Sequence, residues 1–225
     1  MCFSASASYS AAVVLVGTGA YALQQARRLN APHWQLWALV PVFFGIQQAF
    51  EGRVWQMLGT GQPCAAVPYA LGFHFFAHFL WPWWIPLASC LVEPRKIRKR
   101  IFGGCAVFGV FAGALVISVT FLHPEWMTVG VREHSITYKF DIPYRSDIHL
   151  PLKPAAIYAL VVLVPLLCSS HRHVRVFGWL VALSSLFTSE VYGYAYISVW
   201  CFFAALLSLY IIYMIRQLGV RAAAV

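Results

Sequence analysis

Long apolar runs separated by short polar segments divide the chain into seven stretches with the length of membrane-spanning helices. A helix needs about 20 apolar residues to cross a hydrocarbon core of about 30 Å. The stretches are residues 6–27, 34–58, 65–92, 101–122, 154–170, 174–193 and 195–216. A six-span count is the alternative, because a Tyr-rich segment hides the last boundary. The pattern predicts an all-α membrane protein, a seven-transmembrane helix bundle forming a single transmembrane domain over residues 1–225.

The long connection at residues 123–153 shows a different periodicity. From Ser135 to Ile142, polar and apolar residues alternate with period two, which is typical of a half-buried strand. A second extended segment around Val129-Gly130-Val131 would complete a hairpin. We expect this short β-like outer loop to lie over the mouth of the bundle. It is either a lid over a site or a connector without a chemical role.

The composition agrees with a membrane protein. Hydrophobic residues make up 61% of the chain, charged residues only 10%, and the mean hydropathy is +0.71. A soluble domain has roughly 25% charged residues, so this chain has too few to cover a surface in water. A soluble enzyme, a disordered chain, a coiled coil and a disulfide-rich secreted module are therefore excluded.

The distribution of basic residues predicts an orientation. Eleven of the sixteen Lys and Arg residues fall on one side of the predicted spans: Arg27, Arg28, Arg95, Lys96, Arg98, Lys99, Arg100, Arg172, Arg175, Arg216 and Arg221. The outer loop holds four more, balanced by four acidic residues. The positive-inside rule then puts the amino terminus outside and the carboxyl terminus in the cytoplasm. We expect a multi-pass protein of a bacterial inner membrane, in contact with the lipid bilayer. The net charge of +9 is explained without nucleic acid.

The amino terminus and the cysteines give little further information about the fold or the function. The chain opens with Met1-Cys2-Phe3-Ser4-Ala5 and has no basic segment before the first apolar run, so we predict no cleavable signal peptide. Cys2 and Cys64 both fall toward the outer side, where a disulfide is one option. Packed free thiols are the other.

Four ionisable residues are predicted to lie within or near the outer ends of spans. They are Glu51, His74, His78 and Glu190. An ionisable group in hydrocarbon costs several kcal/mol unless it is paired, so such residues point to function. Counting 1.5 Å per residue along alternating helices places all four in the outer half of the membrane.

Their spacing predicts a metal site. His74 and His78 are four residues apart and share a helix face, which allows both imidazoles to ligate one ion. With Glu51 or Glu190 as a third ligand, the set matches catalytic Zn²⁺, and the other glutamate is free to act as general base.

Three polar residues are candidates for contacts around such a site. Gln47 and Gln48 share the helix face of Glu51, while Ser189 precedes Glu190. A different interpretation makes the histidines neutral members of a buried hydrogen-bonded cluster that fixes helix packing.

The cytoplasmic half has no ionisable residue within a span, apart from the helix ends. A polar route therefore stops near His78, which favours a pocket entered from the outer side. We predict a zinc-dependent intramembrane hydrolase that acts on a lipid-like amide or ester, with Glu51 and Glu190 as catalytic candidates. The alternatives are a metal- or proton-linked transporter or sensor, and a structural membrane protein with a buried His/Glu cluster.

Two resemblances bear on this prediction. The opening Met1-Cys2-Phe3-Ser4-Ala5, the segment from Gly45 to Gly52 and the segment from His74 to Trp84 resemble an uncharacterised family of small bacterial polytopic membrane proteins. At the level of the site, the chain is similar to the alkaline ceramidase and adiponectin-receptor superfamily, which implies zinc-dependent hydrolysis of lipid amides. That superfamily carries its His-x-x-x-His pair on the last span, whereas here the pair is on the third.

Overall fold

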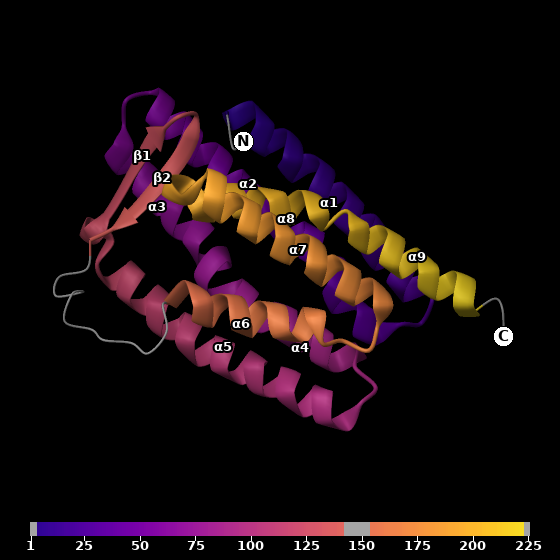
Figure 1. The fold of residues 1–225 in the computed structure, drawn as a ribbon. Helices are drawn as coiled ribbons and strands as arrows, with labels where there is room; N and C mark the ends of the chain where they lie inside the picture. Colours follow the sequence, from indigo (N-terminus) through magenta and orange to yellow (C-terminus); the bar gives the residue numbers. More distant parts are fainter. Residues whose placement is uncertain (1–3, 142–153, 223–225) are drawn as a thin grey trace.

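The computed structural model describes residues 4–141 and 154–222, most of which are helical (Figure 1). The helices are α1 (Ala5–Arg28), α2 (Gln35–Gly59), α3 (Pro63–His74), the π-helix η2 (Phe75–Leu80), α4 (Trp81–Val92), α5 (Lys96–Leu122), α6 (Pro154–Leu167), α7 (Arg172–Val191), α8 (Tyr196–Leu207) and α9 (Tyr210–Ala222). Short 3₁₀ turns are η1 (Pro32–Trp34), η3 (Pro124–Trp126) and η5 (Gly193–Ala195). Each of the seven predicted stretches is helical in this structure.

The protein is a multi-pass membrane protein. Within residues 4–141 and 154–222, five helical segments are long and apolar enough to cross a membrane: Ala5–Arg28, Pro63–Val92, Lys96–Leu122, Arg172–Val191 and Gly193–Leu218. Helix α6 is equally apolar but shorter, and α2 carries several polar residues in its second half. Large apolar side chains of α5 project outward, with Phe111 and Leu115 about 70% exposed. Such a surface suits lipid tails.

Helices α1 and α2 pack closely because small residues lie between them. A Cβ atom on Gly19 would come within 2.8 Å of the Val42 backbone nitrogen, and one on Gly45 within 2.9 Å of the Ala12 carbonyl oxygen. Glycine at position 19 therefore allows close contact between the two helices, whereas Gly17 faces open space.

The third predicted stretch is a helix interrupted by the π-turn η2. Pro82 has no backbone N–H to donate to the carbonyl of His78, four residues earlier, and the Trp81 N–H bonds instead to Phe76, five residues back. A Cβ atom on Gly113 of α5 would come within 2.9 Å of the His78 carbonyl oxygen. The close approach of α5 thus depends on glycine.

The last predicted stretch is divided into α8 and α9. The Ser208 hydroxyl donates to the carbonyl oxygen of Ala205 at 2.6 Å. A serine that bonds to its own helix backbone competes with regular helix geometry. Helix α9 then begins at Tyr210 and packs beside α1.

The predicted hairpin is confirmed. Strands β1 (Met127–Arg132) and β2 (Ser135–Phe140) pair antiparallel, with Val129 opposite Tyr138. The hairpin lies at one end of the bundle beside α3 (Figure 1). Its buried side chains join those of α2 and α3 in a second core: Val54, Ala66, Ala70, Met127, Val129 and Ile136. The role of this hairpin as a lid is untested.

Two predicted features extend beyond the described residues. Cys2 lies outside them, so the disulfide with Cys64 is not tested. The remainder of the outer loop, residues 142–153, also lies outside.

At the opposite end of the bundle, Glu93 joins two turns. Its carboxylate is 2% exposed and accepts hydrogen bonds from the Ser170 backbone N–H at 2.8 Å and the Arg95 N–H at 3.2 Å. Hydroxyl groups of Ser169 and Ser170 also donate to it. Burial alone would raise the pKa of the Glu93 carboxyl, but these donors and the charge of Arg98 outweigh burial and hold its pKa below the ordinary value.

Candidate functional site

A buried carboxylate lies toward the end of the bundle that carries the hairpin, which is called the outer end after the orientation predicted from the sequence. Gln47, Gln48 and Glu51 of α2 are all fully buried, as their shared helix face predicts. The Glu51 carboxylate accepts hydrogen bonds from Gln48 Nε2 at 3.1 Å and from the Ser198 hydroxyl of α8 at 2.6 Å. This arrangement, here called the Glu51 cluster, consists of Gln47, Gln48, Glu51 and Ser198.

Trp81 fixes the orientation of the Gln47 amide. Its indole N–H can only donate, and it lies 2.9 Å from Gln47 Oε1. The amide nitrogen of Gln47 must therefore point the other way. Among the described residues, Gln47 Nε2 and Gln48 Oε1 have no hydrogen-bond partner. The cluster thus presents one buried acceptor without a partner and one buried donor that meets no nitrogen or oxygen acceptor and has only the weakly accepting Cys201 sulfur beside it.

The two histidines lie against each other at the start of the π-turn. His74 ends α3, His78 lies within η2, and their Nδ1 atoms are 3.0 Å apart with the rings nearly parallel. One nitrogen must donate and the other accept in this pair. His74 is 7% exposed, and its Nε2 has no partner within the described part of the chain. The i, i+4 pairing predicted from the sequence is present.

The hairpin reaches the histidines through Tyr138. The Tyr138 ring stacks on Phe73, with 5.2 Å between centroids, and meets the His74 ring edge-on at 4.8 Å. The hairpin therefore covers the site from the outer end.

An outer pocket of about 310 Å³ lies between this hairpin and the start of α8. It is lined by Ile136, Tyr138, Gly193, Tyr194, Ala195, Tyr196, Ile197 and Ser198. Ser198 belongs both to this pocket and to the Glu51 cluster. The outer pocket therefore leads to the buried carboxylate.

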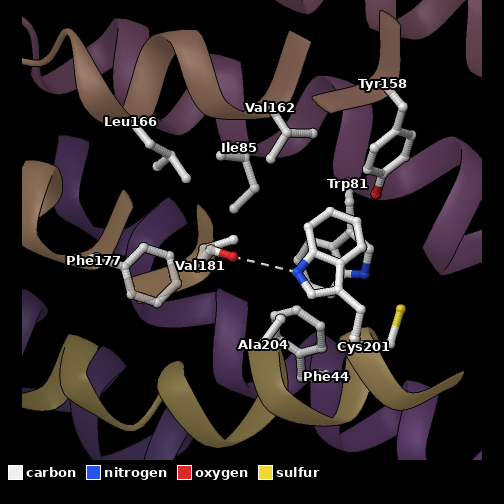
Figure 2. A pocket seen from close by; sticks show the side chains of 11 residues that line it. Phe44, Trp81, Ile85, Tyr158, Val162, Leu166, Phe177, Val181, Cys201 and Ala204 are labelled. Carbon is white, nitrogen blue, oxygen red and sulfur yellow. Dashed lines mark hydrogen bonds between the residues drawn. The ribbon is translucent and has the colours of Figure 1, made fainter. Parts of the chain in front are cut away.

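A second pocket of about 410 Å³, the apolar pocket, lies deeper between α2, α4, α6, α7 and α8 (Figure 2). Its lining residues are Phe44, Trp81, Ile85, Tyr158, Val162, Leu166, Phe177, Val181, Trp200, Cys201 and Ala204. Cys201 is three residues after Ser198 on α8, about 4.5 Å along the helix axis. The Cys201 side chain also interacts with Glu51 and Gln47. The two pockets thus meet at the Glu51 cluster.

Glu190 and Ser189 do not share this environment. Both are exposed on α7, and the Ser189 hydroxyl donates to the Leu186 carbonyl oxygen of its own helix at 2.8 Å. Thr188 is the buried residue of this turn, and Glu190 lies about 200° around the helix from it. Glu190 therefore projects from the face of α7 opposite to Thr188 and does not join the Glu51 cluster.

The predicted zinc ligands do not form a group in this structure. Within residues 4–141 and 154–222, no three His, Cys, Asp or Glu side chains are arranged to hold a metal ion. The paired histidines supply two nitrogen ligands, whereas catalytic zinc takes three protein ligands. The described residues therefore do not fit the ion, and zinc stays a prediction.

Sequence reasoning missed the residues that α8 contributes. Ser198 is the only Ser or Thr between Tyr196 and Leu207, and Cys201 follows on the same helix face. Isolated polar residues in an apolar helix were the available signal. Their contact with α2 joins residues 147 positions apart, which no local pattern predicts.

Comparison with known proteins places the chain in a family. It belongs to DUF6629, a family of unknown function, whose model matches residues 1–224. No curated protein and no solved structure matches the chain. The resemblance to an uncharacterised family is therefore confirmed, and the comparisons do not address the likeness to the alkaline ceramidase superfamily.

Proposed function

We propose that this member of the DUF6629 family is an intramembrane hydrolase for a lipid-like ester or amide that enters from the outer side. One observation carries the proposal. The buried Glu51 carboxylate lies where a pocket with polar groups meets an almost wholly apolar one. This arrangement matches an amphiphile with a polar head and a hydrocarbon tail. It is also typical of ligand sites, which combine an apolar lining with a few convergent polar groups.

Unsatisfied polar atoms support a polar ligand in the Glu51 cluster. A buried donor or acceptor without a partner costs about 1–3 kcal/mol. Gln47 Nε2 and Gln48 Oε1 are such atoms, and both belong to residues that surround Glu51. An ester or amide group offers a carbonyl oxygen to the amide nitrogen of Gln47. An amide N–H or a water molecule satisfies the Gln48 oxygen.

The roles of the residues follow from their chemistry. Glu51 acts as general base and removes a proton from the attacking water, and it returns this proton to the leaving alcohol or amine as the carbon–oxygen or carbon–nitrogen bond breaks. Gln47 Nε2, held by Trp81, donates to the carbonyl oxygen as negative charge develops on it. Ser198 holds the carboxylate in place through its 2.6 Å hydrogen bond. No step in this proposal uses a metal ion.

The test is hydrolysis of acyl esters and amides by the purified full-length protein in detergent micelles. We expect Glu51→Gln to lower turnover at least 100-fold, because a positioned general base contributes about 10² to 10⁴ in rate. Glu190→Gln is the matched control, since its carboxylate is exposed on α7, and its turnover should stay within twofold. Full activity of Glu51→Gln, or no hydrolysis of any substrate by the wild type, would refute the proposal.

A metal- or proton-linked transporter or sensor is the second candidate. The observation in its favour is the His74–His78 pair in the π-turn, because π-turns occur frequently at functional sites. Metal analysis of protein purified without chelators tests the predicted Zn²⁺. Stoichiometric zinc that is lost in His74→Ala/His78→Ala would confirm it. Proton flux into liposomes that depends on His78 would favour transport over hydrolysis.

We also propose the finer topology predicted from the sequence: seven spans in a bacterial inner membrane, with the amino terminus outside. Its support is the basic character of one end of the bundle, where Arg98 donates to the Ser170 hydroxyl and joins two turns. Labelling of single cysteines placed at Gly61 and at Ser170, in intact cells, tests the orientation. We expect a membrane-impermeant maleimide to label the first and not the second.

A further inference from the structure

We infer that the apolar pocket is a tail subsite that takes one hydrocarbon chain, whose length the pocket walls limit. The inference deepens the proposed function and rests on it for the polar end of the ligand. The inference identifies the part of the substrate that the apolar pocket recognises. A binding measurement is enough to test it, without any assay of hydrolysis.

The lining offers a chain almost no hydrogen-bonding groups. Two indole N–H groups lie in it, and both are already used: Trp81 donates to Gln47 and Trp200 to the Val181 carbonyl oxygen. The other side-chain polar groups of the lining are the Tyr158 hydroxyl and the Cys201 thiol. A peptide segment would bring backbone groups that could not be satisfied there. A hydrocarbon chain brings none.

The pocket has a direction. In Figure 2, Tyr158 and Cys201 lie at one end, and Leu166 and Phe177 lie at the other. Cys201 lies one helical turn from Ser198, which donates to Glu51, so its end is the one that meets the polar cluster. Tyr196 of the outer pocket stacks on Trp200 of the apolar pocket, with 5.4 Å between their centroids. A chain attached to a head at Glu51 therefore runs from Cys201 toward Leu166 and Phe177.

The pocket is narrow. Its empty volume of about 410 Å³ includes space that opens to the surroundings, so the enclosed part is much smaller and leaves room for at most one slender chain. Apolar cavities of this kind stay dry and bind apolar molecules. Val162 is 5% exposed and lies in the wall between the two ends, so a larger side chain there would shorten the space for the tail.

The test uses a 16-carbon fatty acid with a mid-chain diazirine, irradiated with the full-length protein in micelles and mapped by peptide mass spectrometry. We expect cross-links on α6 and α7 at the pocket lining. The yield of these cross-links should fall at least fivefold in Val162→Phe. Ala156→Leu on the exposed start of α6 is the control and should label as the wild type does. Val162→Ala, which enlarges the pocket, should retain the labelling.

Competition by unlabelled fatty acids of 8, 12 and 16 carbons tests the length limit. We expect the best competitor to become shorter in Val162→Phe and longer in Val162→Ala. Labelling confined to outward-facing residues such as Phe111 and Leu183, or labelling that is unchanged by both Val162 substitutions, would overturn the inference. Pocket labelling in a protein that hydrolyses nothing would support the tail subsite while refuting the proposed hydrolase.

Discussion

Two buried carboxylates differ in how completely the polar groups around them are hydrogen-bonded. Glu51 lies toward the hairpin end of the bundle and Glu93 at the opposite end, which are the outer and inner ends in the proposed topology. Glu93 accepts two backbone N–H groups and two hydroxyl groups, all from the turns that it joins. Around Glu51, two amide groups are held in place but each leaves one atom without a partner in the described chain. A fully satisfied network rigidifies a fold, whereas an incomplete one costs stability and is retained where something else binds. The inner carboxylate is a structural clamp, and the outer one has the features of a ligand site.

The largest difference is expected in turnover. Glu51→Gln should lower hydrolysis by two to four powers of ten, as expected for loss of a general base. Glu93→Gln, measured per folded molecule in the same assay, should stay within about twofold. A comparable loss of turnover in both variants would mean that the two carboxylates do not differ in role.

The next largest effect is on stability, where substitution of Glu93 should cost more than substitution of Glu51. Glu93→Ala removes a carboxylate that receives several hydrogen bonds, each worth about 1.5–3 kcal/mol when one partner is charged. We expect a loss of about 3 kcal/mol in the free energy of unfolding. Glu51→Gln retains an acceptor for Ser198 and should lose less than about 1 kcal/mol. Thermal unfolding in detergent, followed by circular dichroism, compares the two variants directly.

Acid should weaken the stabilising hydrogen bonds of the Glu93 carboxylate. The pKa of Glu93 is lowered in the folded protein, so its ionised form favours folding. Its contribution is complete above the ordinary pKa of 4.5 and is lost as the pH falls through the folded value below that. We expect the melting temperature to fall more steeply below pH 4.5 in the wild type than in Glu93→Gln. If the melting temperatures of the two proteins fell in parallel as the pH is lowered, ionised Glu93 would not be the group that stabilises the fold.

The sequence predicted those parts of the fold that depend on local periodicity. Apolar runs predicted the helices, and period-two alternation predicted β2. The shared face of Gln47, Gln48 and Glu51 is correct because their spacing in one helix determines it. The division of the last stretch at Ser208 was missed, since a single hydroxyl group in an apolar run gives a weak signal.

The candidate site was predicted only in part, because depth along a helix does not determine rotation about it. Glu190 was predicted at the same depth as Glu51 but is exposed on α7. Ser198 and Cys201 come from α8, which reaches α2 through tertiary packing alone. Contacts of this kind depend on how helices rotate and cross, which one sequence does not specify.

The smallest predicted effect concerns backbone strain at the outer end. The turn of the hairpin holds Glu133 at φ 47° and His134 at φ 60°, a left-handed conformation in which Asn and Gly are favoured. At the inner end the corresponding conformation is taken by Asn30, which tolerates it. Glu133→Asn with His134→Gly should therefore stabilise the protein by about 1 kcal/mol. Because Tyr138, and not the turn, contacts His74, hydrolysis should change less than twofold. A clear loss of turnover with higher stability would show that the hairpin must open for the ligand, which would support the prediction that it is a lid.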